Sequence, residues 1–354
     1  MKIWNLVIDQ AEAKRLVRKM FILGRVPHAL LVWGPPGSGR RALALALAQS
    51  FLCESPVEGL SCGKCSSCLS SASLEHPDLH LLWPAPTSLS PEEETSFRKA
   101  LAEDPYTAPR PSGSLGISID RVRALQRQVA LHPYYGGGKV GIFLDAEYMR
   151  PEAANALLKT LEEPPEGTLL VLTAFRPERL LPTVRSRCQE VPLHPLPTDV
   201  VAGVLKERFH IPSEKALAIA RASGGDMGKA YKLCEVGKEV GERALEFIEM
   251  ALRAGNPLEA LIWEKLEGYP SEEILEWVLL WLRDAFLLGL GVPERVAFSD
   301  ERGTLVRLSE KVRPEALESF LQEAQRASDM LSKNMPARWV LWYVWWRLYG
   351  LFRG

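Results

Sequence analysis

The glycine-rich segment GPPGSGRR, residues 34–41, constrains the fold more than any other part of this sequence. It follows the apolar run ALLVWG at 29–34, which is typical of a buried parallel strand. It precedes RALALALAQSFL at 41–52, which is typical of a helix. A glycine-rich turn between a strand and a helix is the setting of a phosphate-binding loop. The segment therefore predicts an α/β domain with a parallel sheet.

The same segment lacks two side chains that a working phosphate loop uses. The pattern is G-x-x-x-x-G-K-[ST], in which Lys holds the β- and γ-phosphates and the hydroxyl holds Mg²⁺. Gly34 and Gly39 have the required spacing, with Gly37 between them, but Arg40 and Arg41 stand in place of Lys and Ser or Thr. Arginine keeps the charge but is larger and planar, and it cannot ligate a metal ion. An anion could still bind the backbone N–H groups of such a loop.

A second predicted buried strand also lacks a residue that an ATPase uses. KVGIFLD, residues 139–145, ends on Asp145, where a Walker B aspartate would stand. The next position, a glutamate in ATPases of this kind, is Ala146, and Glu147 comes one residue too late. We therefore expect no functional ATP site, although weak anion or nucleotide binding by the loop remains open.

Further segments extend the α/β pattern to about residue 195. PEAANALLKTLEE at 151–163 reads as an amphipathic helix, and TLLVLTAF at 168–175 reads as a third strand. Strands that alternate with helices favour a parallel sheet with both faces covered. Residues 84–116 contain six prolines and two glycines, and they read as an inserted loop.

The rest of the chain is predicted to be helical. We expect an α/β domain at 1–195, a small three-helix lid domain at 196–238 and a C-terminal helical collar domain at 239–354. Thr198, Ser213 and Asp226 are the expected N-caps of the lid helices. Seven of the ten Trp residues lie in the last third of the chain.

One aromatic face stands out in this last third, at the spacing of a single helix face. It consists of Trp339, Trp342, Tyr343 and Trp346. This face forms either an internal bundle core or a contact with other subunits, where Trp is enriched.

Four cysteines give the strongest local signal for a metal. They occur as C-x₈-C-x₂-C-x₂-C, and four thiolates in sixteen residues match a tetrahedral structural zinc site. All four positions are filled by protein, so the expected Zn²⁺ is structural and not catalytic. A reduced cluster without metal is the alternative. The expected ligands of this module, at 53–68, are Cys53, Cys62, Cys65 and Cys68.

Composition excludes several classes of protein. The chain has 354 residues, 47% of them hydrophobic and 25% charged, as in ordinary globular proteins. A net charge of −1 indicates no dominant field for nucleic acid. The N-terminal stretch has no continuous apolar core, and the most apolar segments are interrupted by charges or too short to span a bilayer. We therefore expect a cytoplasmic protein without a membrane partner.

Together these segments resemble the delta prime subunits of bacterial DNA polymerase III clamp loaders, a family of AAA+ proteins. The resemblance rests on the cysteine module after the first helix, NALLKTLEEPP at 155–165, RPERLLPTVRSRC at 176–188 and the degenerate phosphate loop. The second and third of these also occur in the ATP-hydrolysing gamma/tau subunits, so it is the defective site that favours delta prime, and a further position agrees. A lid arginine of those ATPases aligns here with Gly228 in GGDMGKA.

The resemblance implies a role in an assembly. In the family, the arginine of a Ser-Arg-Cys motif enters the ATP site of the adjacent gamma subunit. The matching residue here is Arg187, and Ser186 and Cys188 are expected to shape its loop. The implied partners are gamma/tau and delta subunits, the beta sliding clamp and primer–template DNA. The implied role is that of a rigid stator during clamp loading.

Two other functions remain open from the sequence. One is an ATP-hydrolysing gamma/tau-like subunit with an unusual loop. The other is a stand-alone zinc-containing nucleic-acid-binding protein. For the latter, SIDRVRALQRQVALHP at 118–133 offers Arg121, Arg123 and Arg127 on one helix, either as a solvated face or as a contact to DNA phosphates. No aromatic residues interleave with these arginines, so base stacking is not indicated.

Overall fold

The computed structural model divides the chain into two compact units. One unit comprises Met1–Val200 with Gly225–Lys229, and the other comprises Val201–Gly224 with Ala230–Gly354. The finer division into domains at 195 and 238 stays a prediction. The residues that the structure describes are 3–86, 89–108, 115–135, 137–235, 237–254, 271–293, 296, 302–312, 314–332 and 335–353.

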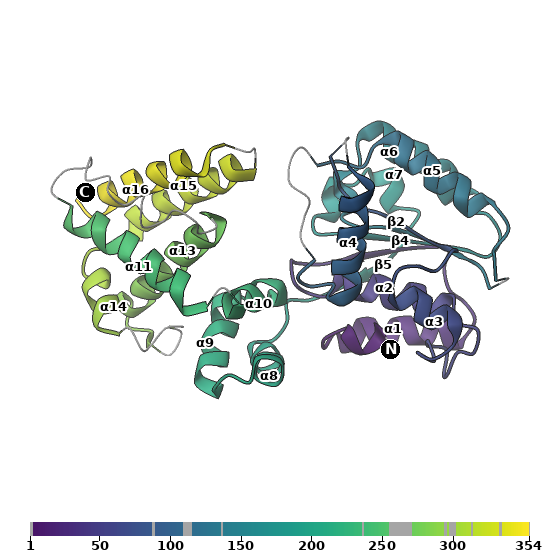
Figure 1. The fold of residues 1–354 in the computed structure, drawn as a ribbon, viewed down its shortest axis with the longest axis horizontal. Helices are drawn as coiled ribbons and strands as arrows, with labels where there is room; N and C mark the ends of the chain where they lie inside the picture. Colours follow the sequence, from purple (N-terminus) through teal and green to yellow (C-terminus); the bar gives the residue numbers. More distant parts are fainter. Residues whose placement is uncertain are drawn as a thin grey trace. The chain divides into compact units, whose positions relative to one another are not determined.

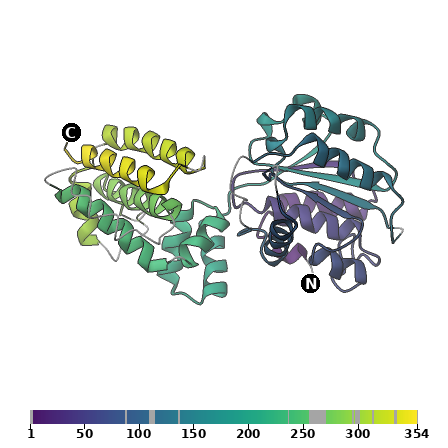
Figure 2. The same ribbon diagram turned by 45° about the horizontal axis from the view of Figure 1, so that its top comes forward.

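The first unit is built on a five-stranded sheet in which all neighbouring strands are parallel. The strand order is β2-β3-β4-β1-β5, and the central register pairs Leu31 of β1 with Leu172 of β4. Figure 2 shows the strands running between two layers of helices. The strands are β1 (Ala29–Trp33), β2 (Leu79–Leu82), β3 (Lys139–Phe143), β4 (Thr168–Ala174) and β5 (Gln189–Pro192).

This sheet confirms the predicted α/β class. The three apolar runs became β1, β3 and β4, which lie at the centre of the sheet and are buried on both faces. The two edge strands, β2 and β5, were not predicted. β5 carries a single buried residue, Val191, so it has no apolar pattern that a sequence analysis could detect.

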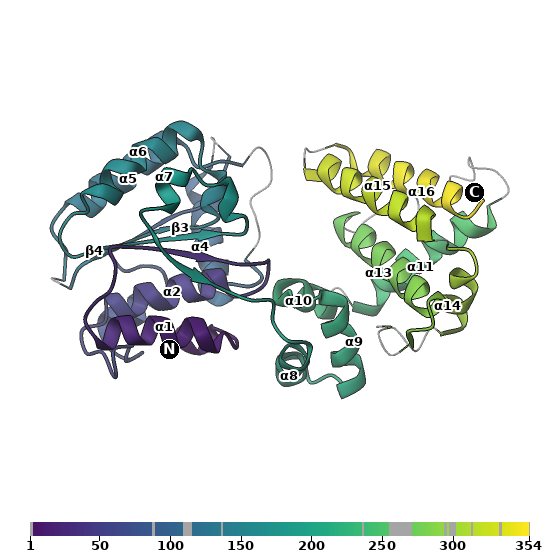
Figure 3. The same ribbon diagram turned by 180° about the vertical axis from the view of Figure 1, so that it is seen from behind.

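Side chains of alternate residues on the central strands pack into two separate hydrophobic cores, one on each face of the sheet. Leu30 and Val32 of β1 point into one core with α1 and α2, while Leu31 points into the other with α5 and α6. Figures 1 and 3 show these helices on opposite faces of the sheet. The helices of this unit are η1 (Ile3–Leu6), α1 (Ala11–Ile22), α2 (Arg40–Phe51), α3 (Ser66–Ala72), α4 (Pro91–Glu103), α5 (Ile119–Ala130), η2 (Ala146–Tyr148), α6 (Pro151–Glu162), η3 (Pro177–Arg179) and α7 (Pro182–Arg185).

The interpretation of 84–116 as a loop is wrong over α4. Ser90 and Glu93 form a capping box at its start, with Pro91 in the first turn. Phe97 is buried and stacks on the Trp83 ring at 4.6 Å between centroids. The prolines of this segment led to the prediction of a loop, but α4 is stabilised by its capping box and by the buried side chains of Phe97 and Leu101. Residues 87–88 and 109–114 of this segment lie outside the described part of the chain.

The remaining helices confirm the predicted helical second half. They are α8 (Thr198–Phe209), α9 (Ser213–Ser223), α10 (Met227–Glu235), α11 (Gly237–Arg253), α13 (Ser271–Gly289), α14 (Arg302–Ser309), α15 (Pro314–Ser332) and α16 (Ala337–Leu351). α8 and α10 each begin in the first unit and continue in the second. None of the helices in the described ranges is both long and apolar enough to cross a membrane.

Of the three predicted N-caps of the lid helices, one is confirmed and two are wrong by one position. Asp226 caps α10, since its Oδ1 accepts the N–H of Lys229 at 3.1 Å. The prediction for Ser213 is wrong by one position, because Pro212 occupies the cap and Ser213 is already helical. Thr198 is likewise the first residue of its helix and not the residue before it.

The aromatic face predicted on α16 is not the core of the helical unit. The core-facing side of α16 carries Val340, Leu341, Val344, Trp345 and Leu348. By contrast, 63% of Trp339 and 44% of Trp346 are exposed, and the Trp342 and Trp346 rings stack on one another at 5.9 Å. The interpretation as an internal bundle core is therefore wrong for this face. Large exposed aromatic side chains of this kind are typical of surfaces that meet a partner.

Candidate functional sites: a closed phosphate loop, a cysteine cluster and the Arg187 loop

The phosphate loop retains its backbone geometry. It joins the end of β1 to the start of α2, as predicted. Gly37 and Gly39 have φ values of +66° and +97°, in the left-handed region that favours glycine. At Gly34 a Cβ atom would lie 2.6 Å from the carbonyl oxygen of Leu193, so no side chain fits there. All three predicted glycines are thus required by the shape of the turn.

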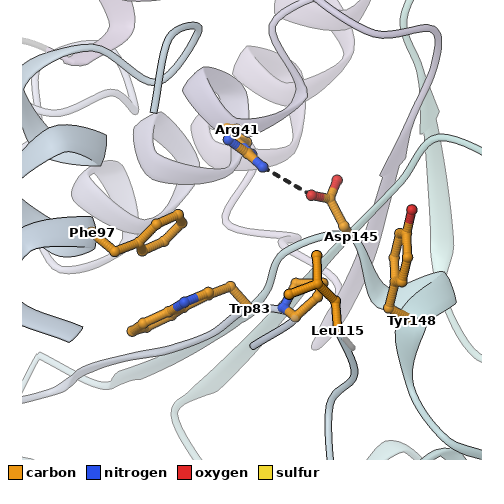
Figure 4. A pocket seen from close by; sticks show the side chains of 7 residues that line it. Arg41, Trp83, Phe97, Leu115, Asp145 and Tyr148 are labelled. Carbon is orange, nitrogen blue, oxygen red and sulfur yellow. Dashed lines mark hydrogen bonds and ion pairs between the residues drawn. The ribbon is translucent and has the colours of Figure 1, made fainter. Parts of the chain in front are cut away.

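The two arginines of the loop bind Asp145. Arg41 Nη2 lies 2.9 Å from Asp145 Oδ2, and Arg40 Nη2 lies 3.5 Å from Oδ1 (Figure 4 draws the Arg41 contact). Arg40 also donates to the carbonyl oxygen of Gly34, and Arg41 donates to that of Ala108 at 3.0 Å. The side chains of Arg40, Arg41 and Asp145 are only 8%, 15% and 3% exposed. A carboxylate of the protein therefore takes the place of an anionic ligand at these arginines.

Two other parts of the same unit pack against the loop. A Cβ atom on Gly37 would lie 2.1 Å from Asp226 Oδ1, and one on Gly39 would lie 2.8 Å from the Tyr106 hydroxyl. Tyr106 is held in turn by Leu6, whose carbonyl oxygen accepts its hydroxyl at 3.1 Å. These contacts leave no space for a side chain at Gly37 or Gly39.

The space beside the arginine pair is very small. A cavity of about 10 Å³ lies next to Arg41 and Asp145, lined also by Trp83, Phe97 and Tyr148 (Figure 4). This volume suits a single water molecule, whereas ligand pockets measure about 300–1,000 Å³. The cavity beside Arg41 and Asp145 therefore holds at most one water molecule.

The residues after Asp145 differ from the acidic pair of an ATPase of this kind. Ala146 is buried and carries no acid–base group. Glu147 Oε1 accepts the backbone N–H of Phe175 at 2.8 Å, at the end of β4. Burial raises the pKa of the Glu147 carboxyl, and the nearby Asp145 adds to this rise. One oxygen of this carboxyl group is thus bonded to the backbone directly after β4.

The position aligned with a lid arginine has no room for a side chain. A Cβ atom on Gly228 would lie 2.6 Å from the carbonyl oxygen of Tyr106. Tyr106 therefore contacts both the phosphate loop and the first turn of α10. The departures at Arg40, Arg41, Ala146 and Gly228 all fall on one closed region of the first unit.

The four predicted cysteine ligands lie together. Their sulfur atoms are all within 4.8 Å of one another, and both the Cys53–Cys65 and Cys62–Cys68 pairs are 3.9 Å apart. A zinc ion with Zn–S bonds of about 2.3 Å requires sulfur separations of about 3.8 Å in a tetrahedron. The cluster thus fits a four-coordinate metal ion.

Backbone N–H groups surround the sulfur atoms. The N–H of Cys62 donates to Cys53 Sγ, and that of Cys65 donates to Cys62 Sγ, both at 3.3 Å. The N–H of Cys68 donates to Cys65 Sγ, and Cys65 is the N-cap of α3. The backbone N–H groups of Lys64 and Cys65 lower the pKa of Cys62 to about 6. These bonds favour the thiolate form of Cys62 that metal ligation needs, whereas burial raises the pKa of Cys53 and Cys68 in the absence of a metal ion.

Gln49 ties the cysteine module to the α/β core, and sequence analysis did not identify it. Its Nε2 donates to the carbonyl oxygen of Cys68 at 2.8 Å. Its Oε1 accepts both the Ser61 hydroxyl and the backbone N–H of Ile3 at 2.9 Å. Gln49 lies on α2, where every residue from 42 to 50 is buried, so a glutamine in a mostly apolar buried helix was the available signal. A buried amide of this kind needs hydrogen-bond partners, and the module provides them.

The structure separates the two arginines of TVRSRC. Arg185, the last residue of α7, binds Glu190 at 2.6 Å, and Glu190 also accepts the Trp33 indole N–H at 2.8 Å. Arg187 lies two residues further on, with a side chain that is 35% exposed and pairs with Glu162 of α6. Arg185 is thus tied to the sheet edge, while Arg187 stands at the surface.

The neighbours of Arg187 bond within the turn. The Ser186 hydroxyl donates to the carbonyl oxygen of Thr183 at 3.2 Å, and the Cys188 thiol donates to that of Val184 at 3.4 Å. Burial raises the pKa of the Cys188 thiol to about 12, which keeps it protonated and unreactive. Both side chains therefore act on the shape of the loop.

Comparison with known proteins identifies the family. A model described as "DNA polymerase III, delta subunit" matches residues 9–197, and one described as "DNA polymerase III, delta subunit, C terminal" matches residues 242–337. DNA polymerase III subunit delta' of Escherichia coli (strain K12) is 30% identical over 309 residues, 87% of this chain and 84% of that protein. The subunit delta' of Pseudomonas aeruginosa is 34% identical over 283 residues, 78% of this chain and 74% of that protein.

The chain belongs to the DNA polymerase III delta' family. Its fold is also similar to the crystal structure of a DNA polymerase III gamma subunit-related protein from Thermotoga maritima. That comparison has a TM-score of 0.45 and 21% identity, and it covers 97% of this chain and 99% of the other.

The three arginines predicted on α5 of this delta' family member do not act as one set. Arg121 donates to the carbonyl oxygen of Trp83 at 2.7 Å and lies over the Trp83 ring at 5.2 Å, so it is a structural residue. Arg123 and Arg127 instead line a groove of about 380 Å³ with Lys159 of α6. The predicted helix is confirmed, and the interpretation as a solvated face is wrong for Arg121.

Proposed function

We propose that this chain is a non-hydrolysing subunit of the DNA polymerase III clamp loader. The observation that carries the proposal is the ion cluster that Arg40 and Arg41 of the phosphate loop form with Asp145. In a working ATPase, the loop Lys holds the phosphates, and the loop hydroxyl and the Walker B aspartate hold Mg²⁺. Here the acid is neutralised by arginines of the loop itself, so the chain keeps the AAA+ shape without the use of ATP.

We further propose that Arg187 completes the ATP site of an adjacent gamma/tau subunit. An arginine finger stabilises the charge that develops on the transferred phosphoryl group. Arg187 is suited to this role because it lies on a surface turn at the end of α7, with more than a third of its side chain exposed. The phosphate loop of this chain is not expected to hold ATP, so we propose that Arg187 acts on ATP bound by another subunit.

The other partners follow from the family. We propose that gamma/tau and delta subunits flank this chain and that the assembly loads the beta clamp on primer–template DNA. The exposed aromatic face of α16, around Trp339 and Trp346, supports a contact between helical collar domains. We also propose one structural Zn²⁺, held by the cysteine cluster.

The test of the finger is clamp loading by reconstituted complexes. Arg187→Ala should lower turnover at the one site that it serves by roughly 10³–10⁵. The effect on total ATPase will be smaller if other sites have their own arginines, so a single-site assay is preferred. Arg185→Ala is the matched control, because it removes a second arginine of the same turn that binds Glu190.

The outcome separates a finger from a scaffold. Arg187→Lys should restore only part of the activity, since lysine keeps the charge but loses the planar fork. If Arg187→Ala complexes load clamps at the wild-type rate at matched assembly, Arg187 has no role in trans. The chain would then serve only as a passive scaffold.

The two alternatives predict different behaviour of the purified chain. A gamma/tau-like ATPase should hydrolyse ATP and lose this activity on Asp145→Ala. A stand-alone nucleic-acid-binding protein should bind DNA without partners and with a steep dependence on salt. The groove of Arg123, Arg127 and Lys159 is the surface that would carry such binding.

A further inference from the structure

The Arg187 guanidinium is held by two acceptors from different elements. Its Nη1 donates to the carbonyl oxygen of Thr183 at 2.9 Å, within the turn of α7. Its Nη2 donates to Glu162 Oε1, on the last residue of α6. A guanidinium has five N–H donors, and these two bonds engage one donor on each terminal nitrogen. Three donors are not used by them.

Both acceptors are attached to rigid parts of the first unit. α7 begins with Pro182, and its Val184 side chain is fully buried. The backbone N–H of Arg187 donates to the carbonyl oxygen of Val184 at 3.2 Å, which closes the turn. α6 is anchored through Leu157 and Leu161, which are buried in the core that contains β1 and β4 residues. The distance between the two acceptors is therefore set by the domain core.

From this arrangement we infer that Glu162 is a positioning residue for Arg187. An arginine side chain has large rotamer freedom, and a charge-assisted hydrogen bond at one edge of the fork restricts it. Thr183 and Glu162 fix one edge, so the remaining donors can meet phosphoryl oxygens of a neighbouring subunit without a search among rotamers. This inference rests on the proposed in-trans role of Arg187. Glu162 itself does not touch the nucleotide.

The experiment compares two adjacent glutamates in reconstituted clamp loaders. Glu162→Gln is close to isosteric and removes the charge, and Glu162→Ala removes the acceptor. The pair is partly exposed, so its loss should slow turnover at the served site by about fivefold, well below the loss from Arg187→Ala. Glu163→Ala is the matched control, because Glu163 is the next residue and is not bonded to Arg187 in the described structure. The KM for ATP should stay unchanged, since only the finger is misplaced.

A double variant distinguishes positioning from a general structural effect. In the Arg187→Ala background, Glu162→Ala should cause no further loss, because it then has nothing to position. Wild-type turnover in both Glu162 variants, or an equal loss in the presence and absence of Arg187, would overturn the inference and leave the finger itself intact. Wild-type turnover in Arg187→Ala would instead remove the proposed function, and the role of Glu162 with it.

Discussion

The buried ion cluster of the phosphate loop should stabilise the α/β unit, and Asp145→Asn tests this. The substitution keeps the shape of the side chain but leaves two arginines without a countercharge at side-chain exposures of 8% and 15%. Removal of one partner from a buried ion pair costs about 3–5 kcal/mol. Asparagine can still accept one hydrogen bond from Arg41, so we expect the lower end, about 3 kcal/mol. This corresponds to a roughly 100-fold larger equilibrium constant for the unfolding of the α/β unit.

Hydrogen exchange measures this effect in the correct part of the chain. A two-unit protein need not unfold in one step, so the free energy should be read from amides of β1, β3 and β4. Their exchange should become about 100-fold faster at equal pH and temperature, while α13 amides in the other unit should be unchanged. Glu94→Gln is the matched control. Glu94 pairs with Arg98 at 3.0 Å, but both side chains are at least 30% exposed, so its loss should change exchange by less than about fivefold.

One result would refute this reasoning. If Asp145→Asn and Glu94→Gln change the exchange of β1 and β3 equally little, the two arginines lose no stabilising interaction. The cluster would then be a consequence of the fold and not a support for it.

Four further outcomes are expected. Protein purified without chelator should contain one zinc per chain by elemental analysis. Cys68→Ser should lower this zinc content, and it should destabilise the cysteine module more than the sheet, because the α/β unit has its own core. The purified chain should not hydrolyse ATP, and a colorimetric phosphate assay that finds turnover sensitive to Asp145 would contradict this. The double change Arg40→Lys with Arg41→Thr should not create an ATPase, because Ala146 supplies no base. Measurable turnover in this variant would contradict the argument from Ala146. The hydrogen bond from Arg185 lowers the pKa of Glu190, so this pair stabilises the fold above the ordinary glutamate pKa of about 4.3 and the stabilisation is lost as pH falls through the lowered value. Unfolding midpoints of wild type and Glu190→Gln should therefore converge at low pH, and a constant difference would argue against the pair.

The local order of elements was determined by the sequence alone. The central strands β1, β3 and β4 are continuous apolar runs, because strands buried on both faces need apolar side chains at every position. The cysteine cluster and the glycine-rich turn could also be predicted from the sequence, because metal ligation and a left-handed backbone each require particular residue types. Edge strands such as β5 were not readable, because only one face of a short edge strand is buried.

Only the tertiary structure decided which charges meet. Arg40 and Arg41 looked like a crowded pair of cations beside a defective loop, yet Asp145, more than 100 residues away in the chain, neutralises them. Arg185 and Arg187 have the same residue type in one short turn, and their separate partners, Glu190 and Glu162, assign them different tasks. A hydrogen bond or ion pair depends on distances of a few ångströms, and packing of the sheet and its helices sets those distances across long stretches of chain.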